Sequence, residues 1–145
     1  MKSIFLPLHL AFAGIWLGCV ITEALFERAL LGKGRAQELI LVTLHKRVDL
    51  FVEIPAFLGV LVTGAFMLAG AGANPLLAAK IVFGLLAIAV NVYCVWLVFR
   101  RATAAQADRW EEFARLDHLQ HKFGAVVLLA IVAALGLGVY RFAGA

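Results

Sequence analysis

Ionisable side chains follow one face of the first hydrophobic stretch of the chain. At about 100° per helical residue, four residues fall within about 40° of each other on this face: His9, Trp16, Glu23 and Glu27. A charged group near the centre of a bilayer costs on the order of a few kcal/mol unless it faces protein, water or a bound ion. The stripe is therefore expected to face inward, with its partners on other helices.

A second set of chemically active residues lies near the start of the second and fourth hydrophobic stretches. His45, Asp49 and Glu53 have i, i+4, i+8 spacing, and His118 and His121 have i, i+3 spacing, so each group shares a helical face. Imidazole and carboxylate ligands suit Zn, Cu, Fe or Ni. The set predicts a metal site at the membrane rim formed by His45, His118, His121 and Glu53; the alternative is histidines that only titrate or meet lipid headgroups. Asp49 could instead form only a surface salt bridge with Lys46 or Arg47.

His9 has a further interpretation, as an axial ligand of haem iron in a helical bundle. Lys80 and Asn91 share a face of the third stretch within about 20°, and with Trp16 they could line such a pocket. The alternatives are a hydrogen-bonded interior histidine and a lysine that snorkels to the interface. The sequence contains no CxxCH motif, so a covalently attached haem is not expected.

The two cysteines, Cys19 and Cys94, lie in the middle of hydrophobic stretches and form no CxxC pair. This arrangement predicts two small buried apolar side chains, with neither a disulfide framework nor a thiolate metal site.

Composition indicates the class of protein. The 145 residues are 64% hydrophobic and 15% charged, with a mean hydropathy of +0.98. Four apolar stretches, about residues 5–26, 50–69, 76–99 and 123–140, are each long enough to cross a hydrocarbon core of roughly 30 Å. We expect one all-α integral membrane domain over residues 1–145, a four-helix bundle in up-down-up-down order, whose first span is retained rather than cleaved as a signal.

Basic residues set the expected orientation. The connections after spans one and three hold ten Lys and Arg, and the opposite side holds three: Lys2, Lys80 and Arg141. The positive-inside rule places both charged connections in the cytoplasm, where residues 35–48 and 104–122 are expected to form helical extensions before spans two and four. Both termini and the turn near Asn74 would face the periplasm. The net charge of +4 follows from this bias and indicates no nucleic-acid partner.

Three motifs stand out in the chain: LHLAFAGIWLG followed by LFE, KRVDLFVEIPAFLGVLVTGAFML, and LLAAKIVFGLLA. They resemble segments of the four-helix bacterial protoporphyrinogen oxidases, and more loosely the membrane domain of copper-resistance D proteins. The matching residues are His9, Trp16 and Gly18 in the first, Arg47, Pro55, Thr63 and Gly64 in the second, and Lys80 in the third. The chain departs from the family at Asn91, where the family usually has a histidine, and at the openings of spans two and four.

The resemblance implies haem b held by His9 and Lys80. We therefore expect a haem-binding protein of the bacterial inner membrane with a redox role, either electron transfer or, as an enzyme, porphyrinogen oxidation with quinone or another membrane carrier as acceptor. The rival hypothesis is transport or sensing of copper, zinc or another divalent metal through His45, His118, His121 and Glu53. A third hypothesis is a non-catalytic membrane subunit. A homodimer could build a pocket between its subunits.

Overall fold

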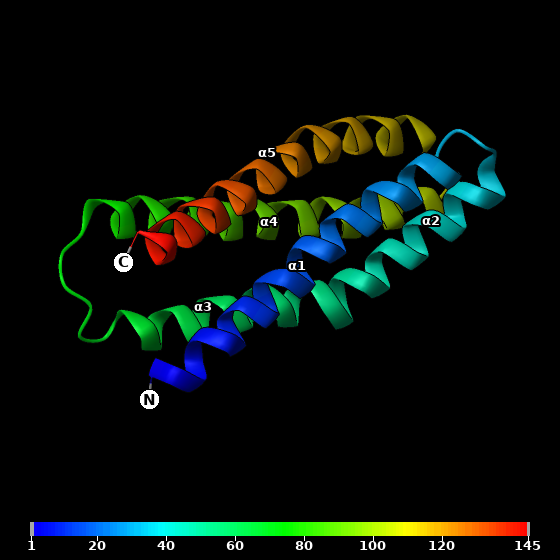
Figure 1. The fold of residues 1–145 in the computed structure, drawn as a ribbon. Helices are drawn as coiled ribbons and strands as arrows, with labels where there is room; N and C mark the ends of the chain where they lie inside the picture. Colours follow the sequence, from blue (N-terminus) through cyan, green and yellow to red (C-terminus); the bar gives the residue numbers. More distant parts are fainter. Residues whose placement is uncertain (1, 145) are drawn as a thin grey trace.

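The computed structural model describes residues 2–144, the first two of them by their backbone alone, and this part of the chain contains helices and no strand. The prediction of an all-α protein is confirmed. The helices are α1 (Lys2–Leu30), α2 (Arg35–Val48), the π-helical segment η1 (Asp49–Glu53), α3 (Ile54–Leu68), α4 (Pro75–Gln106) and α5 (Trp110–Ala143) (Figure 1).

Four helical rods are long and apolar enough to cross a membrane, as the sequence predicts. One of them is continuous through α2, η1 and α3, so residues 35–48 extend the second span as a helix. Both termini and the connection from α3 to α4 lie at one end of the bundle, and the other two connections lie at the opposite end (Figure 1).

The connection between α4 and α5 differs from the prediction. Residues 104–122 are expected to form one helix, but α4 continues to Gln106 and α5 begins at Trp110. Asp108 has a positive φ of 61° and interrupts the helix between them. Arg100 and Arg101 therefore belong to α4 and not to a connection.

The π-helical segment is explained by Pro55, which has no backbone N–H to donate. The N–H of Ile54 reaches the carbonyl of Asp49, five residues earlier. Such wide turns within helices are frequent at functional sites. Here the turn includes two buried acids, Asp49 and Glu53.

The distribution of side chains is that of a protein surrounded by lipid. Large apolar side chains are exposed along the rods, whereas several ionisable side chains are buried between them. The exposed apolar set includes Leu25, Phe51, Val82, Leu129 and Phe142. An apolar exterior around a polar interior is the arrangement expected when membrane spans carry ionisable residues.

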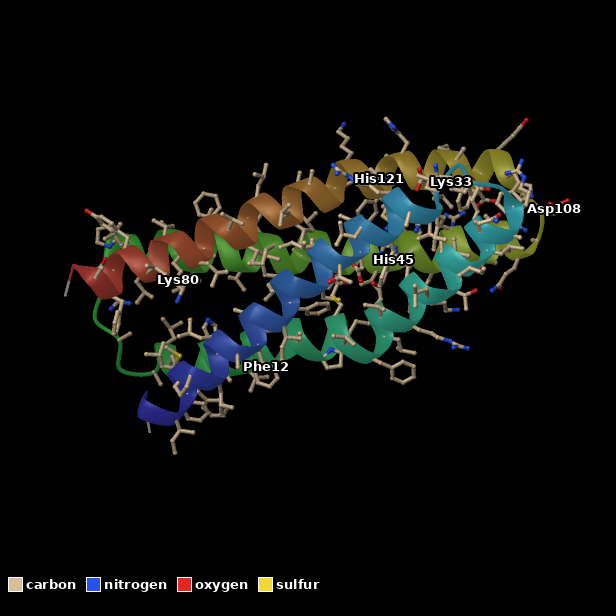
Figure 2. The ribbon with its side chains drawn as sticks, turned by 45° about the vertical axis from the view of Figure 1, so that its right-hand side comes forward. Phe12, Lys33, His45, Lys80, Asp108 and His121 are labelled. Carbon is tan, nitrogen blue, oxygen red and sulfur yellow. The ribbon has the colours of Figure 1, made fainter. Side chains whose placement is uncertain are left out.

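Helices α1 and α3 approach closely where Gly59 faces Phe12. A Cβ atom added at Gly59 would lie 2.5 Å from Cγ of Phe12, which is shorter than real contacts allow. Figure 2 shows where Phe12 lies on α1. The absence of a side chain at Gly59 therefore makes room for the aromatic ring.

We predict that Gly59→Ala destabilises the protein in detergent by about 1–3 kcal/mol, the usual cost of overpacking. Thermal unfolding followed by circular dichroism measures the change. Gly14→Ala is the matched control, because nothing lies within 4 Å of a Cβ added there. Equal melting temperatures for the two variants would contradict the close approach.

Candidate functional site

Four carboxylates and one histidine meet inside the bundle, where α1, α2 and η1 pack together. We call these five residues the acidic cluster: Glu23, Glu27, His45, Asp49 and Glu53. All five are buried. Their spacing of four residues along two helices places them in two facing rows. The inward-facing residues predicted on α1 thus contact residues of α2 and η1.

His45 lies at the centre of the acidic cluster and contacts carboxylates through both ring nitrogens. Nδ1 is 3.0 Å from Oε1 of Glu27. Nε2 is 3.3 Å from Oε2 of Glu23 and 3.6 Å from Oδ1 of Asp49. Figure 2 shows His45 between the helices, away from the connecting end marked by Lys33 and Asp108.

Arg101 on α4 is 0% exposed and holds one side of the acidic cluster in place. Its two terminal nitrogens donate to the two oxygens of Glu27, at 2.6 and 3.3 Å, and one of them also donates to Asp117 at 2.5 Å. The same guanidinium lies 3.2 Å from Nδ1 of His45. Since an ionised carboxylate only accepts, Glu27 accepts both from Arg101 and from the protonated Nδ1 of His45.

Several polar atoms in this region are buried without a hydrogen-bond partner among the described residues. They include both carboxylate oxygens of Asp49, Nδ2 of Asn91 and Oε1 of Gln120. Asp49 is only 1% exposed. A buried carboxylate without a donor is costly, so Asp49 requires a proton or a cation beside it.

A cavity of about 530 Å³ lies beside the acidic cluster between α1 and α5. Exposed Arg28 and His121 in its lining show that the cavity reaches the surface. Its polar lining consists of Glu23, Glu27, Arg28, His45, Asp49, Glu53, Asn91, Gln120 and His121. The space is large enough for water or ions to reach the buried carboxylates.

The predicted haem ligands lie in another part of the bundle. His9 Nδ1 is 2.9 Å from the hydroxyl of Thr63, and Lys80 packs against Gly138 on α5. Figure 2 shows Lys80 toward the end of the bundle opposite Lys33.

The two residues predicted to line the haem pocket contact each other. Trp16 Nε1 donates to Oδ1 of Asn91 at 3.4 Å, and both side chains are buried. Asn91 also lines the cavity beside the acidic cluster, whereas His9, Trp16 and Lys80 do not. Asn91 therefore lies between the two parts of the bundle.

The predicted rim metal site is brought together only in part. His45, Glu53 and His121 line the same cavity, but His118 is exposed on α5 and is not among the residues that line it. Nδ1 of His121 lies 3.3 Å from Asp117, one turn earlier. Asp49 does not form the surface salt bridge considered for it, because it is buried beside His45.

Sequence reasoning missed Arg101 and Gln120 as members of the site. Arg101 is one half of an Arg-Arg pair at the end of a hydrophobic stretch, a position typical of a membrane-interface anchor. One signal was available, because the inward stripe of Glu23 and Glu27 needs a buried cation. The sequence does not indicate which basic residue is that cation.

Comparisons with protein-family models, with curated proteins and with solved structures find no match to this chain. The resemblance to the protoporphyrinogen oxidases and copper-resistance D proteins stays a prediction. The proposals below are therefore argued from the residues of the chain itself.

We predict that Arg101→Met destabilises the protein by about 3–5 kcal/mol, because it leaves buried Glu27 and partly buried Asp117 without their cation. Arg100→Met is the matched control, since Arg100 forms a half-exposed pair with Glu112 that contributes at most about 1 kcal/mol. Unfolding in detergent micelles compares the two. Equal stability of the variants would show that the buried ion pair is not essential to the fold.

Proposed function

We propose that this chain is a four-span membrane protein that binds a divalent transition metal ion in the acidic cluster, as the binding step of metal transport or sensing. The observation that carries the proposal is the environment of His45. One ring nitrogen is occupied by a carboxylate, and the other faces two further carboxylates. This is the arrangement of a histidine ligand with a supporting carboxylate behind it.

The supporting carboxylate is Glu27, which accepts from Nδ1 of His45 while Arg101 fixes its orientation. With Nδ1 protonated, Nε2 of the neutral ring presents its lone pair toward Glu23 and Asp49. A metal ion needs such a neutral imidazole. Glu27 and Arg101 would thus prepare the ring for binding without touching the ion.

The distances fit an ion of this kind. Two ligands about 2.1 Å from a tetrahedral ion lie roughly 3.4 Å from each other. Nε2 of His45 is 3.3 Å from Glu23 and 3.6 Å from Asp49, and the ligand atoms of the three residues all lie within 4.8 Å of one another. A cation at this position would also satisfy the unpartnered oxygens of Asp49. One imidazole and two carboxylates suit zinc and other first-row divalent ions, copper included.

The proposed placement in the membrane follows the distribution of charge. We propose an up-down-up-down order in a bacterial inner membrane, with the connections around Lys33 and Asp108 in the cytoplasm and both termini in the periplasm. Removing buried Arg101 from the ten basic residues of the cytoplasmic side leaves nine, against three on the other side. The excess of basic residues therefore stays on the side assigned to the cytoplasm. The cavity with Arg28 and His121 would then open near the cytoplasmic rim.

We predict that the full chain, purified in detergent and treated with a chelator, binds Zn²⁺ or Co²⁺, and that Asp49→Asn reduces the affinity at least tenfold. Bound metal is measured by elemental analysis after desalting. His118→Ala is the matched control, because that histidine is exposed and does not line the cavity. The metal-free Asp49→Asn variant should be as stable as the wild type or more so, since it removes an unpaired buried charge. Full metal binding by a folded Asp49→Asn variant would refute the assignment.

A second candidate function, redox chemistry with haem b, is favoured by the hydrogen bonds of His9. The hydroxyl of Thr63 donates its single proton to the carbonyl of Gly59 at 2.6 Å, so it accepts from Nδ1 of His9. Nε2 of His9 is then the nitrogen with a free lone pair, as an axial haem ligand requires. His9 would hold the iron through Nε2 and Lys80 through its amine. Bound haem would supply one-electron transfer, with porphyrinogen or quinone as the redox partner.

We predict for this second function that the protein purified from haem-supplied cells shows a sharp Soret band that shifts on reduction with dithionite. His9→Ala should abolish the band, because it removes the ligand. Thr63→Val should weaken haem binding by about 10–100-fold, as loss of a supporting hydrogen bond does. An unchanged spectrum in the His9→Ala variant, or a colourless protein after haem is supplied, would eliminate this function.

A further inference from the structure

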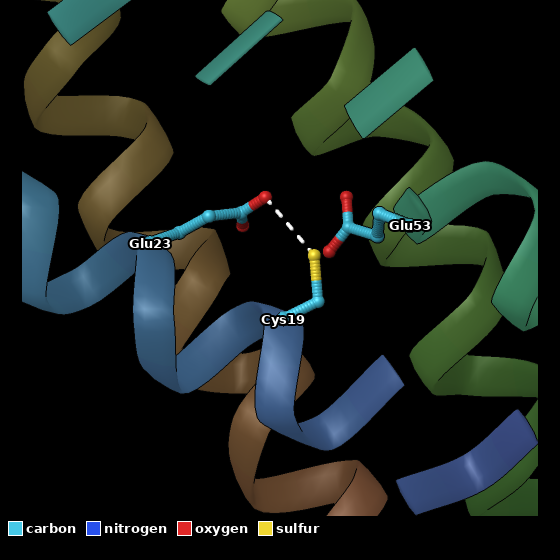
Figure 3. A group of neighbouring side chains, drawn as sticks. All are labelled: Cys19, Glu23 and Glu53. Atoms are coloured by element: carbon cyan, nitrogen blue, oxygen red, sulfur yellow. Dashed lines mark hydrogen bonds between the residues drawn. The ribbon is translucent and has the colours of Figure 1, made fainter. Parts of the chain in front are cut away.

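Cys19 contributes to a second group of ligand atoms beside the first. Its thiol lies 3.4 Å from Oε1 of Glu23, and the ligand atoms of Cys19, Glu23 and Glu53 all lie within 4.8 Å of one another. All three side chains are buried. Figure 3 shows the thiol between the carboxylates of Glu23 and Glu53, which come from different helices. The sequence predicts only a small apolar role for this cysteine.

Glu23 belongs to both groups, and its two oxygens face different partners. Oε1 faces the thiol of Cys19, and Oε2 faces Nε2 of His45. A carboxylate whose oxygens point into two adjacent ligand sets has the geometry of a bridge between two metal ions. Carboxylate-bridged metal pairs are also a recurrent site in the interior of four-helix bundles.

Charge balance favours two ions over one. Arg101 is committed to Glu27 and Asp117, so among the described residues it supplies no contact to the other three acids: Glu23, Asp49 and Glu53. If metal binding deprotonates all of them, these acids and the thiolate of Cys19 carry four negative charges, which two divalent ions balance. A site buried among helices is most stable when its charges cancel.

The carboxylate of Asp49 indicates that a cation or a proton belongs in this interior. It is 1% exposed, and neither of its oxygens has a hydrogen-bond partner in the part of the chain that the structure describes. Its neighbour His45 presents Nε2 at 3.6 Å, beyond hydrogen-bond range but suited to a shared ion.

We propose that the bundle binds a pair of divalent metal ions bridged by Glu23, the first held by His45 and Asp49 and the second by Cys19 and Glu53. The inference rests on the proposed metal-binding function and adds a second ion. A thiolate with carboxylates favours zinc-like ions over Mg²⁺, Ca²⁺ or Mn²⁺. The preferred ligand is therefore Zn²⁺, with Co²⁺ as its spectroscopic substitute.

Titration of the metal-free full chain with Co²⁺ tests the pair. The wild type should bind two ions, and the second should produce a near-ultraviolet charge-transfer band from thiolate to cobalt. Cys19→Ser should bind one ion and lack the band. Cys94→Ser is the matched control and should bind two, because Cys94 is also buried but belongs to neither ligand group. Glu23→Gln should lose both ions if the carboxylate is a bridge.

The outcomes separate this inference from the proposed function. One ion per chain in the wild type, with no thiolate band and no effect of Cys19→Ser, would overturn the pair and leave the site at His45 intact. Retention of one ion by folded Glu23→Gln would overturn the bridge. Absence of any bound ion in the wild type would reject the proposed metal function together with the pair. Thermal unfolding of each variant verifies that it is folded.

Discussion

The structure depends on one buried ion pair, between Arg101 and Glu27. A guanidinium in the interior of a bundle must be well paired, because its desolvation costs several kcal/mol. Arg101 meets this requirement with acids from two other helices, Glu27 on α1 and Asp117 on α5. Glu27 in turn contacts His45 on α2. One side chain of α4 therefore fixes the register of the three other spans at this end of the bundle.

Buried acids outnumber buried basic side chains even after this pairing, because Glu23, Asp49 and Glu53 have no ion pair with Arg101. A core built for stability alone would replace buried acids by apolar side chains, which often pack as well or better. This chain instead keeps Asp49 without a donor among the described residues and places a surface-connected cavity beside it. Buried ionisable groups in membrane spans are a general mark of ion or proton handling.

The helices could be predicted from the sequence, but the residues that form the site could be predicted only in part. Length and hydropathy predict the four rods, and the spacing of Glu23 and Glu27 predicts their inward orientation. Arg100 and Arg101 differ only by a rotation of about 100° on one helix, and this rotation makes one exposed and the other buried. An offset of about 60° between His118 and His121 likewise brings only His121 to the cavity. Such choices depend on which helices are neighbours, and hydrophobic periodicity in a membrane span carries little of that information.

The π-helical turn at Asp49–Glu53 makes the acidic cluster depend on the geometry of the backbone as well as on its side chains. Compared with a regular α-helix, such a turn accommodates about one extra residue. If the same residues instead formed a regular α-helix, everything before the turn would be rotated by about 100° relative to α3. His45 would then leave its place opposite Glu23 although it remained in the sequence. The rotation of α2 relative to α3 therefore determines the site together with the residues themselves.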